Sequence, residues 1–276
     1  MAKLLHICSH LPCKALTNKE LSIRFQNWSP EKILAKTGIA ERKISAEDET
    51  ASDLAIKAGE KLLSKKIIDK NDIDMLIFVT QTPDRALPAS ACFIHQQLGL
   101  KINCGAFDIN QGCSGYIYGL SIAKGIISSG EAKNVLLLTG DTYTKLLDPR
   151  DRSVATLFGD GASASLIGPD LKGEKPGIGF CSFGTNGDGA GLLKCDYGGW
   201  RIPKNDQKPL SMDGAGILTF TLSTLPKELN IYLEKIQKKF EDYDHIIFHQ
   251  ANQFILEKLY KKLGIQEKGI IHMSTS

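Results

Sequence analysis

Residues 105–130 read GAFDINQGCSGYIYGLSIAKGIISSG, and this stretch decides the fold. The apolar part before Gln111 predicts a buried strand, and the periodic part over 114–129 predicts a helix that ends at a glycine. Cys113 therefore occupies a turn between a strand and a helix. The free N–H groups and partial positive charge of a helix N-terminus favour a thiolate, so Cys113 is a candidate nucleophile. A buried packing cysteine is the alternative that this segment alone leaves open.

The composition excludes several classes of protein. The chain has 276 residues and a formal net charge of +3, which gives no electrostatic case for binding nucleic acid. No stretch approaches the roughly 18 apolar residues of a membrane span, so we expect no membrane partner. A strand-like segment begins at residue 3, and we therefore expect no signal peptide. The seven cysteines lack paired spacing, which argues against disulfides and a metal site and predicts a cytoplasmic location.

Strand and helix patterns alternate along the chain, which predicts an α/β protein with mostly parallel strands. Pro and Gly cluster after residue 168, so we predict two halves, 1–168 and 169–276. Residues 184–214 are rich in Gly, Asp, Asn and Pro and predict a long irregular excursion. The predicted strands are 4–8, 75–80, 105–109, 134–139, 162–167, 178–183, 245–249 and 269–273.

Three local signals refine this outline. Thr50 and Asp53 have the spacing of a capping box, and Ser29 followed by Pro30 predicts another helix start. Residues 159–161 read Gly-Asp-Gly and predict a tight turn with glycines at positive φ, whose aspartate bonds backbone amides. We expect this turn to support a site rather than to react.

A second candidate for chemistry is His249. The apolar residues 244–248 predict a strand, and Asn252 is a natural N-cap for a helix over 253–263. His249 then has the same setting as Cys113, and catalytic groups collect at the carboxyl ends of strands in α/β sheets. Histidine moves a proton or donates a hydrogen bond near pH 7. Taken alone, a structural histidine remains open.

Several motifs form a larger pattern. They are Thr37–Arg42 (TGIAER), Pro88–Ala91 (PASA), Phe107–Asp108 (FD), Gly112–Gly115 (GCSG), Tyr118–Leu120 (YGL), Asp148–Arg152 (DPRDR), Phe158–Ala162 (FGDGA) and His249–Asn252 (HQAN). In order and approximate spacing the set resembles the β-ketoacyl-[acyl-carrier-protein] synthase III group of the thiolase superfamily. No single motif is decisive, but the set is highly specific.

The resemblance implies a five-layered α/β/α/β/α fold with two pseudo-twofold halves, and a homodimer. It implies a decarboxylative Claisen condensation of an acyl-CoA starter with a malonyl thioester, without a cofactor. Cys113 would form the acyl-enzyme. His249, together with an asparagine, would hydrogen-bond the malonyl thioester oxygen as negative charge develops there.

The resemblance also implies binding residues. Arg152 matches an arginine that touches the nucleotide part of CoA, Lys36 replaces another arginine there, and Gly214 falls where the family lines its pantetheine tunnel. The implied carrier-protein segment is Gln250, Ala251, Asn252, Gln253 and Phe254. Because Phe254 replaces an arginine that receives the acidic acyl carrier protein, an acceptor other than this carrier stays open.

Residues 273–276 come just before the place where the family has a Gly-Asn-Thr/Ser stretch. We therefore expect the catalytic asparagine and the last strands of the second half to be absent. Our hypothesis is a truncated or shortened form in which acylation of Cys113 survives and condensation is much reduced. Two alternatives are an acyltransferase of the same fold that serves another acceptor, and a non-catalytic chain that binds acyl-CoA or a sister subunit.

Overall fold

The structure is a computed structural model that describes residues 1–169 and 177–265. It contains two compact units. The first unit comprises residues 1–14, 43–143 and 159–181, and the second comprises 15–42, 144–158 and 182–276. The predicted halves, 1–168 and 169–276, divide the chain at one point, whereas each unit combines three segments of the chain. The halves therefore stay a prediction.

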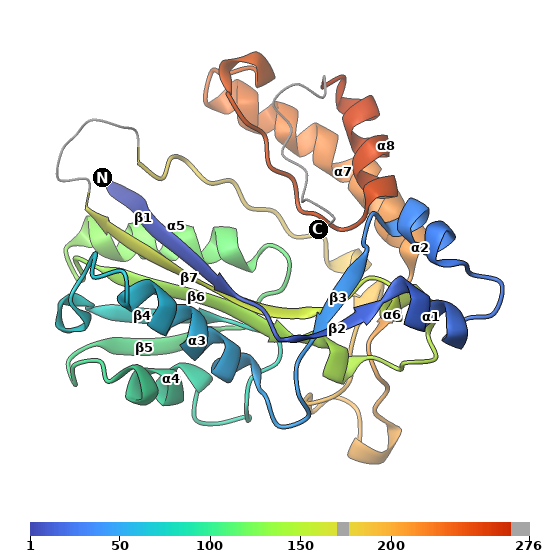
Figure 1. Ribbon diagram of the computed structural model, residues 1–276. Coiled ribbons are helices and arrows are strands. Elements are labelled where there is room, and N and C mark those ends of the chain that lie inside the picture. The colour runs from blue at the N-terminus through green and yellow to red at the C-terminus, as the bar shows by residue number, and fades with distance from the viewer. Residues whose placement is uncertain (170–176, 266–276) are drawn as a thin grey trace. The chain divides into compact units, whose positions relative to one another are not determined.

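A five-stranded mixed sheet forms the centre of the first unit (Figure 1). β4 runs parallel to both of its neighbours, β5 and β6, whereas β7 runs antiparallel to β6 and to β1. The carboxyl ends of β4, β5 and β6 therefore meet at one edge of the sheet. In spatial order the strands are β1 (Ala2–His10), β7 (Asp160–Pro169), β6 (Val135–Thr142), β4 (Met75–Val79) and β5 (Gly105–Ile109).

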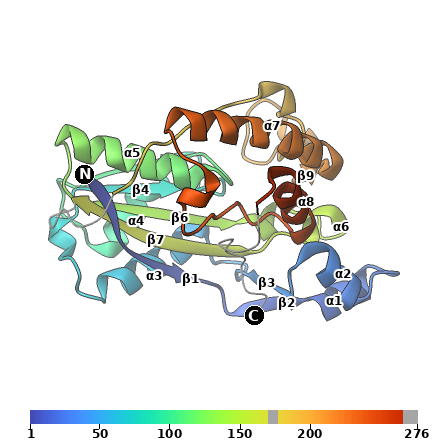
Figure 2. The same ribbon diagram turned by 90° about the horizontal axis from the view of Figure 1, so that it is seen from above.

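Helices cover both faces of this sheet, with α5 on one face and α3 and α4 on the other (Figures 1 and 2). The alternation of side chains along β4 shows why: Leu76 and Phe78 join the core under α3 and α4, while Ile77 and Val79 join the core under α5. A strand that is apolar on both faces must be covered on both. These helices are α3 (Ala51–Leu63), α4 (Ser90–Leu98) and α5 (Gly115–Ser129).

The second unit is mostly helical, with two small sheets formed by β2 with β3 and by β8 with β9. Its elements are β2 (Lys14–Thr17), α1 (Asn18–Arg24), α2 (Pro30–Thr37), β3 (Glu41–Ile44), α6 (Arg152–Ala155), β8 (Leu193–Lys194), β9 (Ser211–Met212), α7 (Gly214–Lys235) and α8 (Gln253–Leu263). The described chain also has short 3-10 helices: η1 (Lys70–Asp72) in the first unit, η2 (Tyr143–Leu146), which begins at the last residue of a first-unit segment, and η3 (Gly187–Gly189), η4 (Lys204–Asp206) and η5 (Phe240–Asp242) in the second.

Buried Arg42 connects three segments of the second unit. Its Nε donates to the Thr156 carbonyl oxygen at 2.9 Å, and its Nη1 donates to the Asn18 side chain. Burial lowers the pKa of Arg42 to about 10. A buried charge is tolerated only where its donors are satisfied, so Arg42 fixes the segment after α6 against α1.

The local predictions are largely confirmed. Five predicted strands correspond to β1, β4, β5, β6 and β7, and the helix expected over 114–129 begins one residue later. The Thr50–Asp53 capping box is present, and Ser29 and Asn252 cap α2 and α8. Residues 184–214 are mainly irregular, as expected.

Two predicted strands are wrong as far as residues 1–169 and 177–265 show: 178–183 form no strand, and 245–249 contain a single bridge residue, Ile246, and no named strand. An apolar pattern marks a segment that suits a buried surface, but a strand also needs hydrogen-bonded neighbours along its length. Between these segments and the rest of the described chain, one such backbone bond is Ile178 N–H to the Ala2 carbonyl oxygen at 2.8 Å. The strand predicted at 269–273 lies outside the described residues.

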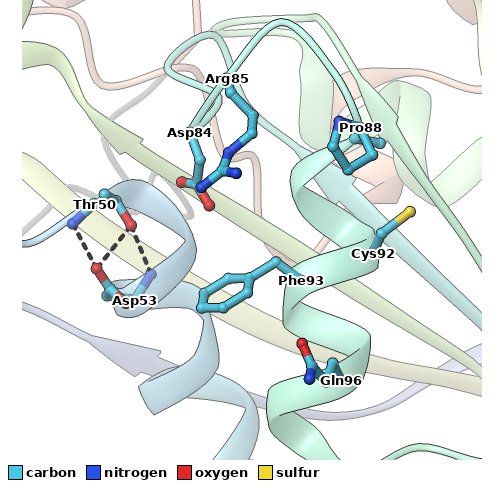
Figure 3. A pocket seen from close by; sticks show the side chains of 9 residues that line it. Thr50, Asp53, Asp84, Arg85, Pro88, Cys92, Phe93 and Gln96 are labelled. Carbon is cyan, nitrogen blue, oxygen red and sulfur yellow. Dashed lines mark hydrogen bonds between the residues drawn. The ribbon is translucent and has the colours of Figure 1, made fainter.

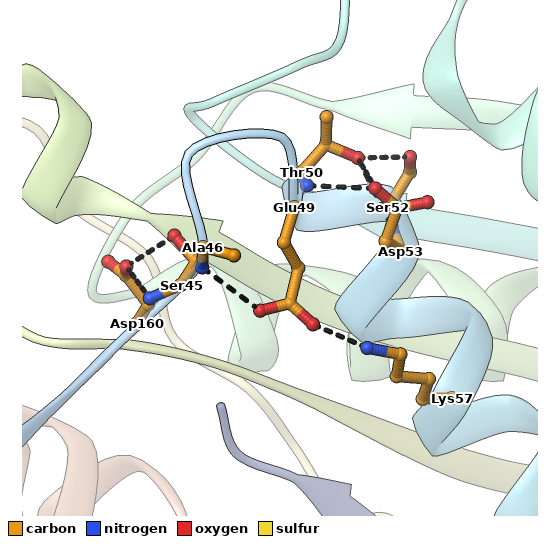
Figure 4. A network of polar contacts seen from close by, with 8 residues as sticks. All are labelled: Ser45, Ala46, Glu49, Thr50, Ser52, Asp53, Lys57 and Asp160. Carbon is orange, nitrogen blue, oxygen red and sulfur yellow. Dashed lines mark hydrogen bonds and ion pairs between the residues drawn. The ribbon is translucent and has the colours of Figure 1, made fainter. Parts of the chain in front are cut away.

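The Gly-Asp-Gly turn also differs from its prediction in part. Neither glycine has a positive φ. Asp160 does bond a backbone amide, because its carboxylate accepts from Ser45 N–H at 2.8 Å and from Ser45 Oγ at 2.7 Å (Figure 4). A Cβ on Gly161 would lie 2.8 Å from Leu11 Cδ2, so a side chain there would have to displace the end of Leu11.

Candidate active site

Cys113 lies in a tight turn between β5 and α5 in the first unit. Gly115 N–H donates to the Gly112 carbonyl oxygen at 2.8 Å, which closes the turn around the cysteine. Ser114 is the N-cap of α5, and its side chain makes no capping bond. The Cys113 side chain is exposed, so a substrate can reach the sulfur from solvent.

The glycines on either side of Cys113 let this turn approach β4. A Cβ on Gly115 would lie 2.4 Å from Val79 Cγ1, and a Cβ on Gly112 would lie 2.3 Å from Gln81 Oε1. Real Cβ atoms do not approach other atoms this closely, so a side chain at Gly115 would push the turn away from Val79, whereas one at Gly112 would have to displace the end of the Gln81 side chain. The turn therefore rests on the carboxyl end of β4.

The electrostatic setting of Cys113 differs from the sequence-based expectation of a favoured thiolate. Although its surface is accessible, the protein atoms around it desolvate the thiol and raise its pKa, and the charge of Asp141 adds to this rise. Asp141 is itself half-buried. Its Oδ1 accepts from Gln81 N–H at 2.7 Å and from the hydroxyls of Thr80 and Thr82, each at 3.1 Å. Burial raises the pKa of Asp141 to about 6 despite these bonds.

These shifts have a chemical consequence. A thiol with a raised pKa is mostly protonated at neutral pH, so Cys113 must lose its proton as the substrate arrives. The N–H groups at the start of α5 then favour the thiolate at the moment of attack.

His249 lies just before α8 in the second unit. Its carbonyl oxygen accepts from Ala251 N–H at 3.0 Å, and Asn252 Oδ1 accepts from Ile255 N–H at 2.9 Å to cap the helix. Desolvation lowers the pKa of His249, so its imidazole is neutral at pH 7 and keeps one N–H donor. Since Cys113 belongs to the first unit, the joint action of the two residues stays a proposal.

A cationic cluster surrounds Trp28 in the second unit. The Arg152 guanidinium carbon lies 4.4 Å from the indole centroid, and the Nζ atoms of Lys32 and Lys36 lie 5.5 and 5.8 Å from it. A cavity of about 470 Å³ is lined by Trp28, Arg152 and Thr37 among others. The structure thus brings the predicted Lys36 and Arg152 together on one aromatic ring.

Sequence reasoning missed Trp28. The chain has 2 tryptophans, and Trp28 stands within a few residues of Lys32 and Lys36. A rigid aromatic face near a run of cations is a signal for binding a planar or anionic group. Its partner Arg152 is remote in sequence, so the pairing needed the tertiary structure.

Gly214 is the first residue of α7. The side chain of Asp213 caps this helix by accepting from Ala215 N–H at 3.1 Å and Gly216 N–H at 3.0 Å. No atom lies within 4 Å of a Cβ built on Gly214, so the space beside it is open. β9 ends two residues before Gly214 and contacts α6, the helix that begins at Arg152.

The predicted carrier-protein segment has mostly internal contacts. The amide of Gln250 donates to the Phe248 carbonyl oxygen at 3.0 Å, and that of Gln253 donates to Glu257 at 2.7 Å. Asn252 is engaged as the cap of α8. Phe254, by contrast, is 48% exposed, and Lys258 Nζ lies 5.5 Å from its ring centroid. Phe254 is therefore the side chain of this segment best placed to meet a partner.

A second cavity of about 470 Å³ lies in the first unit between the start of α3 and α4 (Figure 3). Asp84, Arg85, Cys92 and Phe93 line it, and none of the predicted site residues does. Within residues 1–169 and 177–265, no cluster of His, Cys, Asp and Glu could hold a metal ion. None of the helices described there is long and apolar enough to span a membrane.

The family model and the curated relatives point to one family. The family model of 3-oxoacyl-[acyl-carrier-protein] synthase III matches residues 107–189, which include Cys113. The β-ketoacyl-[acyl-carrier-protein] synthase III of Neisseria gonorrhoeae (strain NCCP11945) is 36% identical over 271 residues, covering 98% of this chain and 83% of the relative. Synthase III 1 of Vibrio parahaemolyticus is 38% identical over 273 residues, with the same coverage of 98% and 83%.

Solved structures give the same result. A crystal structure of 3-oxoacyl-(acyl-carrier-protein) synthase III has a TM-score of 0.95 and 42% identity, covering 99% of this chain and 86% of that chain. The 3-oxoacyl-(acyl-carrier protein) synthase from Burkholderia xenovorans LB400 has a TM-score of 0.88 and 33% identity, with coverage of 99% and 80%. The predicted thiolase-like α/β fold class is therefore confirmed.

Proposed function

The chain belongs to the β-ketoacyl-[acyl-carrier-protein] synthase III family, and we propose that Cys113 and His249 carry its condensing reaction. The enzyme is an acyltransferase that joins an acyl starter to a malonyl thioester through an acyl-cysteine. Cys113 is the nucleophile of this reaction. The observation that carries this assignment is an accessible thiol in a glycine-built turn at the start of α5.

In the first step, Cys113 attacks the carbonyl carbon of an acyl-CoA. The sulfur–carbonyl bond forms, the CoA thiolate leaves, and the proton lost from Cys113 passes to solvent or to the leaving thiolate. The start of α5 favours the thiolate as it forms.

In the second step, a malonyl thioester loses CO₂, and the resulting carbanion attacks the acyl-cysteine. The neutral His249 imidazole donates a hydrogen bond to the thioester oxygen as negative charge develops there. Cys113 then leaves as the thiolate, and no cofactor is required.

The cluster around Trp28 binds the nucleotide end of acyl-CoA. Arg152 and Lys36 supply positive charge for the phosphates, and the indole supplies a flat face for the adenine base. Gly214 leaves room for the pantetheine arm beside the start of α7.

We propose two protein partners. The acyl carrier protein approaches α8, where Phe254 is exposed beside Lys258, and the last turn of the helix carries Lys261 and Lys262. A second copy of this chain pairs with β5, the strand at one end of the sheet order, because a bare strand edge favours pairing with another chain. Light scattering tests the homodimer, and a monomer at micromolar concentration would contradict it. We also propose that the enzyme works in the cytoplasm.

Intact-protein mass spectrometry after incubation with acetyl-CoA tests the proposal. We expect a mass increment of one acetyl group that is lost in Cys113→Ala and kept in Cys92→Ala, which removes another exposed cysteine. Release of CO₂ from a malonyl thioester by the acylated protein supports condensation. Acylation without CO₂ release would instead favour transfer to another acceptor, and an increment that persists in Cys113→Ala would exclude Cys113 as the nucleophile.

A further inference from the structure

The proposed reaction does not use the cavity between the start of α3 and α4 (Figure 3). Its volume of about 470 Å³ lies within the range of small-molecule sites, which is roughly 300–1,000 Å³. Its lining residues belong to the first unit, and the two helices that form it cover the sheet face opposite to α5 (Figures 1 and 2). The cavity is therefore separate from the turn that carries Cys113.

The Asp84 carboxylate on the wall of this cavity is only partly satisfied. Its Oδ2 accepts a hydrogen bond from Ser52 Oγ at 2.7 Å. Its Oδ1 is buried and has no hydrogen-bond partner among the described residues. The other carboxylate of the lining, Asp53, has its Oδ2 engaged by Thr50 N–H and Thr50 Oγ1, each at 2.8 Å. Because a buried carboxylate oxygen without a donor is costly, Asp84 favours a ligand that brings a cationic N–H group.

The next residue in the chain supplies the opposite charge. Arg85 also lines the cavity, and it is exposed. An arginine guanidinium binds a carboxylate through paired N–H groups. A carboxylate and a guanidinium on consecutive residues thus match a ligand whose ammonium and carboxylate groups are attached to one carbon atom, as in an α-amino acid.

An aromatic ring adds an apolar surface to this pair of charges. Phe93 comes from α4 and is 41% exposed. Figure 3 shows its ring reaching from α4 toward α3, below Asp84 and Arg85. An alkyl side chain that covers this ring removes apolar area from water, which contributes about 25 cal/mol per Å². The cavity therefore favours an amino acid with an apolar side chain over a polar one.

We propose that this cavity binds a free α-amino acid with an apolar side chain, such as L-leucine. The ammonium group donates to Asp84 Oδ1, the carboxylate accepts from the Arg85 guanidinium, and the alkyl side chain covers the Phe93 ring. The ligand binds reversibly and takes no part in covalent chemistry. This binding goes beyond the condensing reaction and does not depend on it.

Isothermal titration calorimetry of the wild-type protein with L-leucine tests the proposal. We expect a dissociation constant of about 1 mM or lower. Two analogues separate the charged groups, because 3-methylbutylamine lacks the carboxylate of L-leucine and 4-methylpentanoate lacks its ammonium group. Each should bind about tenfold more weakly than L-leucine or worse. Glycine, which has no side chain to cover the ring, should also bind more weakly.

Variants of the two charged residues sharpen the test. Asp84→Asn and Arg85→Gln should each weaken L-leucine binding about tenfold. Arg85→Gln should leave the affinity for 3-methylbutylamine unchanged, since this amine has no carboxylate. Glu60→Gln is the matched control, because Glu60 is an exposed acid on α3 that does not line the cavity. Circular dichroism melts identify a variant that fails to fold, and Arg85→Gln, which changes an exposed residue, then decides in place of Asp84→Asn.

The outcomes separate this inference from the proposed function. Cys113→Ala should bind L-leucine as tightly as the wild type, because Cys113 does not line the cavity. Failure of the wild type to bind L-leucine would overturn the inference and leave Cys113 as the proposed nucleophile. Equal affinities for L-leucine and 3-methylbutylamine, or wild-type affinity in both charge variants, would also overturn it. Loss of binding in Cys113→Ala would place the amino acid at the acylation site instead.

Discussion

Cys113 and His249 both precede a helix, but different forces position them. The Cys113 turn follows a real strand, rests on β4 and has no side-chain cap at the start of α5. The segment before His249 forms no named strand, and the helix after it begins with an Asn252 cap. Packing against the sheet therefore positions the first turn, whereas a local hydrogen bond positions the second.

This difference predicts how each region responds to change. A turn held by close packing should be sensitive to the volume of a single methyl group. A turn held by a cap should be sensitive to the loss of one side-chain acceptor and tolerant of added volume. Four experiments follow, three in order of decreasing effect and the last with an effect that depends on pH.

The largest effect should come from Gly115→Ala. The new Cβ meets Val79 Cγ1 at 2.4 Å, and pushing the turn off β4 should destabilise the protein by about 1–3 kcal/mol. Gly125→Ala is the matched control, because it lies on the same helix with no atom within 4 Å of a new Cβ. It should stabilise the protein by about 0.5–1 kcal/mol. Urea unfolding measures both, and shifts of the same sign would refute packing as the determinant.

Trp28→Ala should weaken the binding of acyl-CoA. Arg152 and Lys36 both contact the Trp28 ring and lose this support when the ring is removed. KM for acetyl-CoA should therefore rise about tenfold, which corresponds to about 1.4 kcal/mol. The rate of Cys113 acylation at saturation should change little. Acetyl-pantetheine, which lacks the nucleotide, is the control substrate, and an equal loss with it would rule out a nucleotide site at Trp28.

Asn252→Ala should destabilise the second region by about 1 kcal/mol, because Ile255 N–H loses its acceptor. Asn252→Asp restores an acceptor at the same place and should keep the wild-type stability. Thermal unfolding followed by circular dichroism measures the difference. If both variants had the same melting temperature, the Asn252 cap would not be what holds the turn at His249 in position.

The effect of Asp141→Asn comes last because its size depends on pH. In the folded protein burial raises the pKa of Asp141 to about 6 from the ordinary value of 3.8. Between these two values the folded state keeps a proton that the unfolded chain has lost, so the wild type loses stability as pH rises through this window. Asparagine has no such loss, so the variant should gain stability relative to the wild type from about pH 4 to about pH 7.

The same variant should change the reactivity of Cys113. The charge of Asp141 contributes to the raised pKa of the thiol, so its removal should move the pH profile of Cys113 alkylation toward lower pH. Exposed Asp69, the N-cap of η1, provides the control, and Asp69→Asn should leave both profiles unchanged. A profile that does not move in Asp141→Asn would show that desolvation alone raises the pKa of Cys113.

The sequence predicted the elements that local rules control. The Thr50, Ser29 and Asn252 caps are all present, because a cap involves residues close together in the chain. The strands expected at 178–183 and 245–249 failed because a strand depends on neighbours that its own residues do not specify. The raised pKa of the free Cys113 thiol was not predicted for a similar reason, since desolvation depends on atoms from remote segments.

By itself, the sequence determined the family, the strand–turn–helix around Cys113 and the helix that follows His249, since short spacings and local hydrogen bonds encode them. Tertiary structure alone placed Arg152 over Trp28, Asp141 behind Gln81, and Tyr143 against Gly112. These pairs are separated by 31 to 124 positions in the chain, and no pattern in the sequence specifies their distance. Sheet order and packing bring them within a few ångströms, where charge, burial and shape act on the site.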